Sequence, residues 1–538
     1  MKAELKYLRN GEPKLIKWIP DTIEEFDFLS HTIGMRVQRD GSYHFPVSSF
    51  LANEVKNSFG KVIFDKPLTE MLSEWETKTK KIRDLWFSDE KNLPESNLPL
   101  YDYQKRDKLI MEVMRRCING NDMGLGKTLE TISVITKGKK TLIVCPSSLK
   151  YNWEIEIEKF RPELTVANTN FANVNLRKKS LSADKDIYIV NYEMLKDSYK
   201  EIFETEYDLV VFDEAHRLQN PKTYWYRYFE KNEKYDRLLL LTGTPVSQNP
   251  LELWSLLHLI DPKEFSSQSI FMEHFCELAF NPFSMSPLVV GVKNKDKLHE
   301  MLLPYLFRRK KEDVLELPEK QYITVSLTLP EKIEKLYKKL LKEKYLNIGS
   351  KMLRAETGME VVLRARQLVL DPKILGITES SVKTDTILEL IEDMKQVVIF
   401  TVFKHYANNL KEALKKNKIS VSMYTGDTSE KERTKSIQDF VSGKTKVFLA
   451  TVTAGGVGLN LQNAHDVIFA DKPYNPAILK QAEDRCHRNG QKHPVTIYYL
   501  CMKNTVDEII DRILKRKEKI TDDTLIIKEV YEELLKSR

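Results

Sequence analysis

The stretch D-M-G-L-G-K-T, Asp122–Thr128, is followed by a run with helical character. Its glycines let the backbone turn closely enough for amide N–H groups to point at a phosphate. In such a loop Lys127 reaches the β- and γ-phosphates of a nucleotide, and the Thr128 hydroxyl binds Mg²⁺. The first glycine of the pattern G-x-x-x-x-G-K-[ST] is missing, because Asn121 stands there. The alternative is an accidental Gly-Lys-Thr in an ordinary turn.

Short apolar runs alternate with helical patterns around this loop. Each run is short and ends at polar, glycine or proline positions, as buried strands of a parallel sheet do when helices cover both faces. The runs between residues 98 and 310 are 142–145, 187–190, 209–212 and 238–241. A second series comprises 397–400, 421–424, 447–450, 467–469 and 495–500. The sequence therefore predicts an α/β protein with two lobes in series.

An acidic motif, Asp213-Glu214-Ala215-His216, follows the run 209–212 directly. Its carboxylates are expected at the carboxyl edge of the sheet, where open α/β sheets hold ligands. Asp213 is the candidate Mg²⁺ ligand, and Glu214 is the candidate for orienting and polarising an attacking water. The alternative is a helix N-cap with acidic residues favoured by the helix dipole. The order of strand, phosphate loop, strand and acidic motif favours the catalytic interpretation.

Two further segments are candidates for sensing the nucleotide. Thr242-Gly243-Thr244-Pro245 follows the next strand, where such a turn can sense the γ-phosphate and signal to the second lobe. Taken alone, it would more often be an ordinary turn. In the segment 481–491, Arg485 and Arg488 stand three apart on one helical face, as arginine fingers could. Spacing alone favours equally a surface salt bridge to the neighbouring acidic residues 483 and 484.

The chain divides into four parts. Residues 1–95 form a small N-terminal domain, with a hairpin whose strands flank an Asp40-Gly41 turn and a helix over 51–59. Residues 96–320 form the first lobe. Residues 321–380 are helical in pattern, with an apolar face over 333–341, and form a linker or protrusion. Residues 381–538 form the second lobe with C-terminal helices.

Composition narrows the class of protein. The net charge of +7, from 85 basic and 78 acidic residues among 538, permits nucleic-acid binding without requiring it. No run of 18 apolar residues occurs, and the N-terminus has no apolar core behind its lysines, so we expect neither a membrane span nor a secretory signal. The five cysteines are scattered, which argues against zinc and against a disulfide framework.

At this point the residues resemble the Swi/Snf family of superfamily-two ATPases over residues 98–507. Asp122–Thr128 is similar to the family's D-E-M-G-L-G-K-T, which uses acidic residues where other phosphate loops use glycine. Asp213–Asn220, D-E-A-H-R-L-Q-N, and the segment 481–491 match later motifs in the family's order. Tyr474-Asn475-Pro476 stands where the family commonly has Trp-Asn-Pro, a mild aromatic exchange.

The resemblance implies ATP and Mg²⁺ as cofactors and assigns roles to particular residues. The catalytic residues would be Lys127, Asp213, Glu214, Arg485 and Arg488, with Thr128 and Asp213 at the metal. The ATP-binding residues would be Tyr103, Gln104, Asp122, Met123, Gly124, Leu125, Gly126, Lys127, Thr128, Gly458 and Gln481. Coupling would involve Thr242, Gly243 and Thr244. The DNA-binding residues would be Asn191, Tyr192, Thr425, Gly426 and Thr453.

The implied function is that of an ATP-driven translocase on double-stranded or branched DNA, which remodels or anneals DNA or displaces bound proteins. The alternatives are a strand-separating DNA or RNA helicase and a nucleotide-gated clamp. The segment Asp40–Pro46 and Q-A-E-D-R resemble the annealing-helicase branch, so residues 1–95 are interpreted as a HARP-like substrate-recognition domain. Protein partners in repair or defence complexes fit this function. The expected location is the nucleus in a eukaryote and the cytoplasm in a prokaryote or virus.

Overall fold

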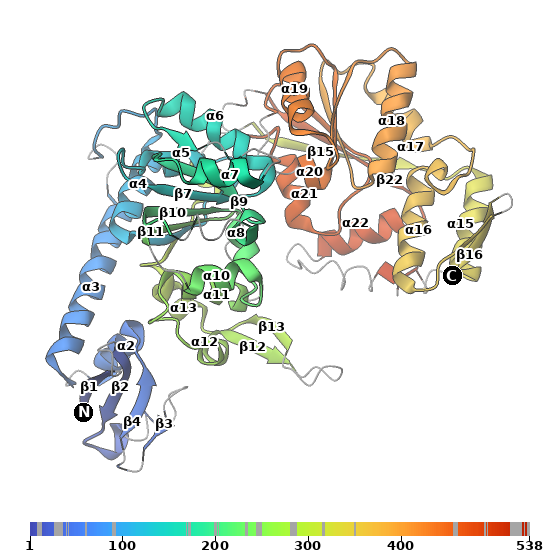
Figure 1. Cartoon of the computed structure of the whole chain (residues 1–538). Coiled ribbons are helices and arrows are strands. Elements are labelled where there is room, and N and C mark those ends of the chain that lie inside the picture. Colours follow the sequence, from blue (N-terminus) through green and yellow to red (C-terminus); the bar gives the residue numbers. More distant parts are fainter. Residues whose placement is uncertain are drawn as a thin grey trace. The chain divides into compact units, whose positions relative to one another are not determined.

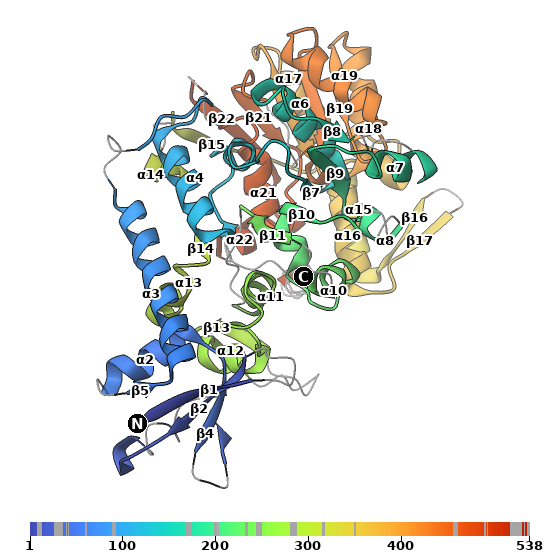
Figure 2. The same cartoon turned by 60° about the vertical axis from the view of Figure 1, so that its left-hand side comes forward.

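The computed structural model describes most of the chain. The described residues are 1–7, 13–25, 29, 36–38, 40, 42–59, 62–88, 93–167, 169, 174–197, 202, 204–231, 235–243, 250–279, 288–314, 318–348, 351–455, 461–488, 491, 493–516, 530–531 and 533–534. The chain folds into two compact units (Figures 1 and 2). The first contains residues 1–122 and 126–310, and the second contains residues 123–125 and 311–538. Among the described residues, no helix combines the length and the hydropathy needed to cross a membrane.

A parallel sheet forms the centre of the first lobe. Its strand order is β14-β6-β11-β10-β7-β9-β8. The bounds are β6 Arg116–Asn119, β7 Thr141–Cys145, β8 Val166–Ala167, β9 Ile187–Asn191, β10 Tyr207–Asp213, β11 Tyr235–Leu241 and β14 Leu306–Phe307. The four predicted runs are confirmed as β7, β9, β10 and β11. The apolar side chains of β7 and β10 are almost completely buried, because helices cover both faces of the sheet.

Helices and one hairpin surround this sheet. The helices are α4 Asp102–Met114, α5 Lys127–Ser133, α6 Lys150–Phe160, α7 Val174–Leu181, α8 Met194–Asp197, α10 Tyr224–Lys231, α11 Pro250–Ile260, α12 Gln268–Phe275 and α13 Lys295–Leu302. The hairpin consists of β12 Cys276–Ala279 and β13 Leu288–Val292. Side chains from the sheet and from α10 to α13 form one continuous apolar core.

The N-terminal domain is the expected small α+β fold. Its sheet has the order β3-β4-β2-β1-β5. The elements are β1 Lys2–Tyr7, β2 Pro13–Ile19, β3 Arg36–Val37, β4 Tyr43–Pro46, α2 Ser49–Phe59, β5 Ile63–Phe64 and α3 Lys66–Trp86. The predicted hairpin is confirmed, since Val37 pairs with Tyr43. The predicted helix is confirmed as α2, and the Ser48 hydroxyl accepts a hydrogen bond from the Leu51 amide at its start.

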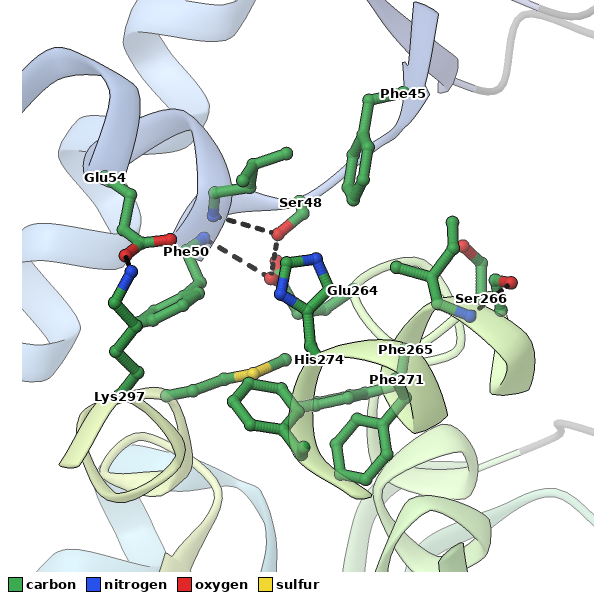
Figure 3. A pocket seen from close by; sticks show the side chains of 15 residues that line it. Phe45, Ser48, Phe50, Glu54, Glu264, Phe265, Ser266, Phe271, His274 and Lys297 are labelled. Atoms are coloured by element: carbon green, nitrogen blue, oxygen red, sulfur yellow. Dashed lines mark hydrogen bonds and ion pairs between the residues drawn. The ribbon is translucent and has the colours of Figure 1, made fainter. Parts of the chain in front are cut away.

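This domain packs on the first lobe and belongs to the same compact unit. Glu264, in the segment after α11, accepts hydrogen bonds from the Ser48 hydroxyl at 2.5 Å and the Ser49 amide at 2.7 Å (Figure 3). Phe50 joins the apolar core of the lobe, and Lys297 of α13 pairs with Glu54 of α2 at 2.5 Å. The long helix α3 then runs from the domain to the lobe (Figure 1).

The second lobe has its own parallel sheet, with strand order β15-β22-β21-β18-β20-β19. The bounds are β15 Lys320–Leu327, β18 Val397–Thr401, β19 Val421–Tyr424, β20 Val447–Thr451, β21 Asp466–Phe469 and β22 Val495–Met502. The five predicted runs are confirmed. The strand β15 occupies the start of the stretch expected to be a helical linker, and it pairs with β22 along its whole length. Its alternating polar and apolar residues suit an edge strand that is exposed on one face.

The remaining elements of the second unit are mostly helical. They are α14 Lys311–Val314, α15 Glu331–Glu343, α16 Gly358–Leu370, α17 Val382–Leu390, α18 Lys404–Lys416, α19 Glu430–Val441, α20 Val452–Gly455, α21 Pro476–Glu483 and α22 Val506–Arg516, with a hairpin of β16 Tyr345–Ile348 and β17 Lys351–Arg354. Helices α15, α16 and α22 share an apolar core (Figure 1). The predicted apolar face of α15 is buried in this core.

Candidate functional site

The phosphate loop and the acidic motif begin at one edge of the first sheet. The pairing register places Phe307, Asn119, Leu241 and Asp213 in one row across β14, β6, β11 and β10. All four strands run in the same direction, so the segments that follow them leave from the same edge. Parallel pairing therefore brings together the start of the loop, Thr242 and Glu214, which are far apart in the sequence.

The two glycines of the phosphate loop adopt a conformation that side chains disfavour. Gly124 has φ of 86° and Gly126 has φ of 85°, both in the left-handed region. A Cβ atom at Gly126 would also collide with the amide of Gln104. The loop thus requires glycine at both positions, and Gly126 leads directly into α5.

Lys127 is held inside the loop. Its ammonium donates to the main-chain oxygen of Asn121 at 2.6 Å and to that of Asp122 at 3.3 Å. Burial lowers the pKa of Lys127, and the nearby carboxylates of Glu214 and Asp213 oppose this shift. Because the pairing register also places Glu214 beside the start of this loop, the loop and the acidic motif form one charged cluster.

Asn121, which replaces the usual glycine, belongs to a buried polar network. Its side-chain amide donates to Asp107 of α4 at 2.8 Å, and its side-chain oxygen accepts from the Arg309 amide at 2.8 Å. Arg309 Nε also donates to Asp107 at 2.9 Å. Asn119 donates to Glu130 of α5 at 2.7 Å, and burial together with Asp107 raises the pKa of Glu130 to about 8. The network joins α4, the loop, α5 and the segment after β14.

The predicted adenine-recognising pair lies against this loop. Gln104 is buried, and its side-chain oxygen accepts a hydrogen bond from the Tyr101 amide at 3.0 Å, which helps to cap α4. Tyr103 is also buried, and its ring stacks on Tyr101 with centroids 5.9 Å apart. Because the amide of Gln104 fills the space beside Gly126, this pair and the loop are neighbours.

Hydrogen bonds hold the acidic motif in place. Trp153 of α6 donates from its indole nitrogen to Asp213 Oδ2 at 2.9 Å, and the Glu214 amide donates to Asp213 Oδ1 at 2.9 Å. Burial and the neighbouring Glu214 raise the pKa of Asp213 to about 6. Glu214 has φ of 54°, a left-handed conformation, and its side chain makes no capping hydrogen bond to the short helix that follows. For Asp213, the candidate for an N-cap, the two side-chain oxygens accept the hydrogen bonds from Trp153 and from the Glu214 amide.

The predicted DNA-binding pair in the first lobe divides into an accessible and a buried residue. Asn191 ends β9 and is partly exposed. Tyr192 is fully buried, and its hydroxyl donates to the main-chain oxygen of Asp213 at 2.9 Å. The Tyr192 side chain has no exposed surface, because its aromatic ring packs in the core against Phe212 and Trp225. DNA binding at Tyr192 therefore stays a prediction.

The predicted coupling turn is partly described. Thr242 is buried, and its amide donates to the main-chain oxygen of Asn119 at 3.1 Å, which ties the end of β11 to the strand before the phosphate loop. Gly243 follows it. Thr244, like Gly458 in the second unit, lies outside the described residues.

In the second unit, the predicted arginines follow α21. Gln481 is half-buried on α21, Arg485 is buried and Arg488 is partly exposed. The adjacent acidic residues pair with a lysine of β15: Lys320 lies 3.0 Å from Glu483 and 2.8 Å from Asp484. The acidic residues thus have a cationic partner that the sequence analysis did not consider.

The predicted DNA-binding residues of this unit differ in accessibility. Gly426 and Thr453 are exposed. Thr425 is buried, and its main-chain oxygen accepts a hydrogen bond from Arg433 at 3.0 Å. Its hydroxyl lies 3.1 Å from that of Thr428. Main-chain groups around Gly426, rather than the Thr425 side chain, are therefore presented to solvent.

The donor set of the first lobe fits a magnesium nucleotide. The loop has glycines where the backbone turns most sharply, a lysine at its end and a threonine hydroxyl next to that lysine. Asp213 adds a carboxylate, the type of oxygen ligand that Mg²⁺ prefers. The sequence analysis did not identify Asp107, Asn119, Glu130 or the bond from Trp153, because each of these contacts joins residues of different elements.

Comparisons with known proteins identify the family of this chain. Residues 51–374 match the SNF2-related domain, and residues 382–490 match the helicase conserved C-terminal domain. A Mycoplasma pneumoniae protein named as an uncharacterized ATP-dependent helicase is 30% identical over 430 residues, which cover 76% of this chain and 40% of that protein. The human DNA annealing helicase and endonuclease ZRANB3 is 30% identical over 445 residues, which cover 79% of this chain and 40% of that protein.

A solved structure is also similar. The Sulfolobus solfataricus SWI2/SNF2 ATPase core in complex with double-stranded DNA is 27% identical, with a TM-score of 0.38, over 83% of this chain and 97% of that one. The chain spans about two fifths of the length of the curated relatives it matches. Because the SNF2-related domain alone covers more than half of the residues, the resemblance to the Swi/Snf family is confirmed, and the chain belongs to the SNF2-related family of helicase-like ATPases.

Proposed function

We propose that this chain is a DNA-dependent ATPase that translocates along double-stranded DNA and remodels or anneals branched DNA or displaces bound proteins. The observation that carries the proposal is the single sheet edge at which the phosphate loop, Asp213 and Glu214 meet. In the proposed reaction Lys127 binds phosphate oxygens of ATP, and Glu214 orients the attacking water. Mg²⁺, which Thr128 and Asp213 would hold, supplies neutralisation of phosphate charge.

Further residues complete the proposal. Arg485 and Arg488 neutralise charge on the γ-phosphate during hydrolysis, as arginine fingers do. Asn191, Gly426 and Thr453, which have accessible surface, contact the DNA backbone, and basic residues add contacts that depend on salt and not on sequence. Residues 1–95 recognise the DNA substrate as a HARP-like domain. The name of the human DNA annealing helicase among the similar proteins supports the proposed action on branched DNA.

Steady-state ATP hydrolysis tests the proposal. The rate is measured without nucleic acid and with single-stranded DNA, duplex DNA, forked DNA and double-stranded RNA, beside a Glu214→Gln control. We expect strong stimulation by duplex or forked DNA that is lost in the control. Activity only with single strands or RNA would indicate a strand-separating helicase. Nucleotide binding without hydrolysis under any condition would indicate a nucleotide-gated clamp.

A further inference from the structure

Tyr192 lies between a partly exposed turn and the acidic motif of the first lobe. It directly follows β9, and its side chain is fully buried. The hydroxyl donates to the main-chain oxygen of Asp213 at 2.9 Å and lies 3.5 Å from that of Glu214. The ring packs against Phe212 and Trp225, with centroids 6.1 Å and 6.4 Å away. The hydroxyl therefore reaches the acidic motif from a ring that the core holds in one position.

The main-chain oxygen that accepts this hydrogen bond belongs to a strained part of the backbone. Glu214 has φ of 54° and ψ of 49°, a left-handed conformation that costs a non-glycine residue about 1 kcal/mol. The oxygen that Tyr192 binds belongs to the peptide between Asp213 and Glu214, and the plane of this peptide sets φ of Glu214. Holding that oxygen therefore fixes the direction in which the Glu214 side chain leaves the backbone.

The residues on the other side of Tyr192 reach the surface. Asn191 donates from its side-chain amide to Glu193 at 2.6 Å, and Glu193 lies 3.6 Å from Arg217. The Arg217 guanidinium lies over the Tyr192 ring, 5.2 Å from its centroid, which is a cation–π contact. The side chains of Glu193 and Arg217 are 57% and 42% exposed. A polyanion at this surface would attract Arg217 and repel Glu193, and both residues adjoin Tyr192.

We propose that Tyr192 is a positioning residue that couples this surface, formed by Asn191, Glu193 and Arg217, to the orientation of Glu214. The inference rests on the proposed function, because it assigns to Tyr192 the step between DNA binding and hydrolysis. Nucleic acid that engages Arg217 shifts the turn after β9, and the Tyr192 hydroxyl transmits the shift to the peptide that carries Glu214. The Tyr192 side chain itself contacts neither DNA nor nucleotide.

The test removes only the hydroxyl. In Tyr192→Phe we expect the duplex-stimulated kcat to fall about tenfold, since one net hydrogen bond is lost from the reactive arrangement. The KM for ATP and the Kd for duplex stay within about twofold of wild type. Tyr226→Phe is the matched control, because Tyr226 of α10 is buried and its hydroxyl has no hydrogen-bond partner in the described part of the chain. The control keeps the wild-type kcat.

The outcomes separate the inference from the proposed function. A wild-type protein that no duplex stimulates defeats the proposed function. The positioning role is then judged by hydrogen exchange of residues 213–218, which Tyr192→Phe accelerates and Tyr226→Phe does not. Equal exchange in both variants overturns the positioning role. A Tyr192→Phe variant with unchanged kcat, or with weaker duplex binding and unchanged kcat, also overturns it.

Discussion

Asn121 Nδ2 lies 2.8 Å from Asp107 Oδ2, so the residue that replaces a phosphate-loop glycine fixes the loop to α4. The Asn121 side-chain oxygen also accepts from the Arg309 amide at 2.8 Å, and Arg309 lies over the Trp86 ring. An amide can donate and accept at once, and both of its groups are used here. The departure from the common glycine pattern is thus a structural feature of this loop.

Restoring the common glycine should destabilise the first lobe. Asn121→Gly leaves the Arg309 amide and part of Asp107 without a partner in the interior, and we expect the free energy of unfolding to fall by about 1–3 kcal/mol. Chemical denaturation measures it. Asn121→Ala controls for the added backbone freedom of glycine and should show most of the loss. If the free energies of unfolding of both variants lie within about 0.5 kcal/mol of the wild-type value, the network contributes little to stability.

The indole of Trp153 should tune metal-dependent nucleotide binding. Trp153→Phe keeps an aromatic ring in α6 but removes the donor to Asp213. Because a hydrogen bond to a ligating carboxylate orients it, we expect the Mg²⁺ concentration for half-maximal nucleotide binding to rise roughly tenfold. Titration of a fluorescent ATP analogue with Mg²⁺ measures this.

The matched control for Trp153 lies in the N-terminal domain. Trp18 is fully buried, and its indole nitrogen has no hydrogen-bond partner among the described residues. Trp18→Phe should leave the Mg²⁺ dependence unchanged. Equal Mg²⁺ midpoints in both variants and in wild type would contradict the role of Trp153.

Docking of the N-terminal domain should weaken as pH rises. Burial, with Asp261 adding to it, raises the pKa of Glu264 to about 7 from an ordinary 4.5. A carboxyl with a raised folded-state pKa contributes stability that is complete below its unfolded pKa and is lost as pH rises through the folded value. We therefore expect hydrogen-exchange protection of α2 to decrease between about pH 5 and pH 8. In Glu264→Gln the protection of α2 should be the same across this pH range. A variant whose protection falls with pH as it does in wild type would refute the assignment to Glu264.

The acidic pair at the end of α21, Glu483 and Asp484, should stabilise the second lobe. Asp484 is buried and lies 2.8 Å from Lys320 and 3.6 Å from Lys311. Asp484→Asn removes the carboxylate that Lys320 and Lys311 share, while Glu483 still pairs with Lys320 and the His487 main-chain oxygen still accepts from Lys311. We expect about 1.5–3 kcal/mol of destabilisation in denaturant unfolding.

An ion pair with an exposed lysine provides the comparison for Asp484. Asp439 lies 3.1 Å from Lys444, whose side chain is largely exposed. Asp439→Asn should change the free energy of unfolding by less than about 1 kcal/mol, because water and salt screen such a pair. Equal effects of the two substitutions would mean that burial adds nothing to the Asp484 contacts.

The sequence by itself determined the two lobes and the order of their motifs. Runs such as Leu142–Cys145 and Val397–Phe400 are apolar throughout and bounded by polar or proline positions, as the buried strands of a parallel sheet are. The glycines, lysine and carboxylates of the site were recognisable because phosphate and Mg²⁺ chemistry restricts each position to few residue types. The family comparisons agree with the two-lobed fold.

Only the tertiary structure decided which side chains support the site. The strand β6, R-C-I-N, is too short and too polar to predict, and it forms because β11 and β14 pair with it on either side. Tyr192 appeared as a DNA contact in the sequence, yet its ring fills the core and its hydroxyl reaches Asp213. Such contacts join residues far apart in the chain. A local sequence pattern indicates the type of an element and its buried face, but it does not indicate which distant residue each side chain contacts.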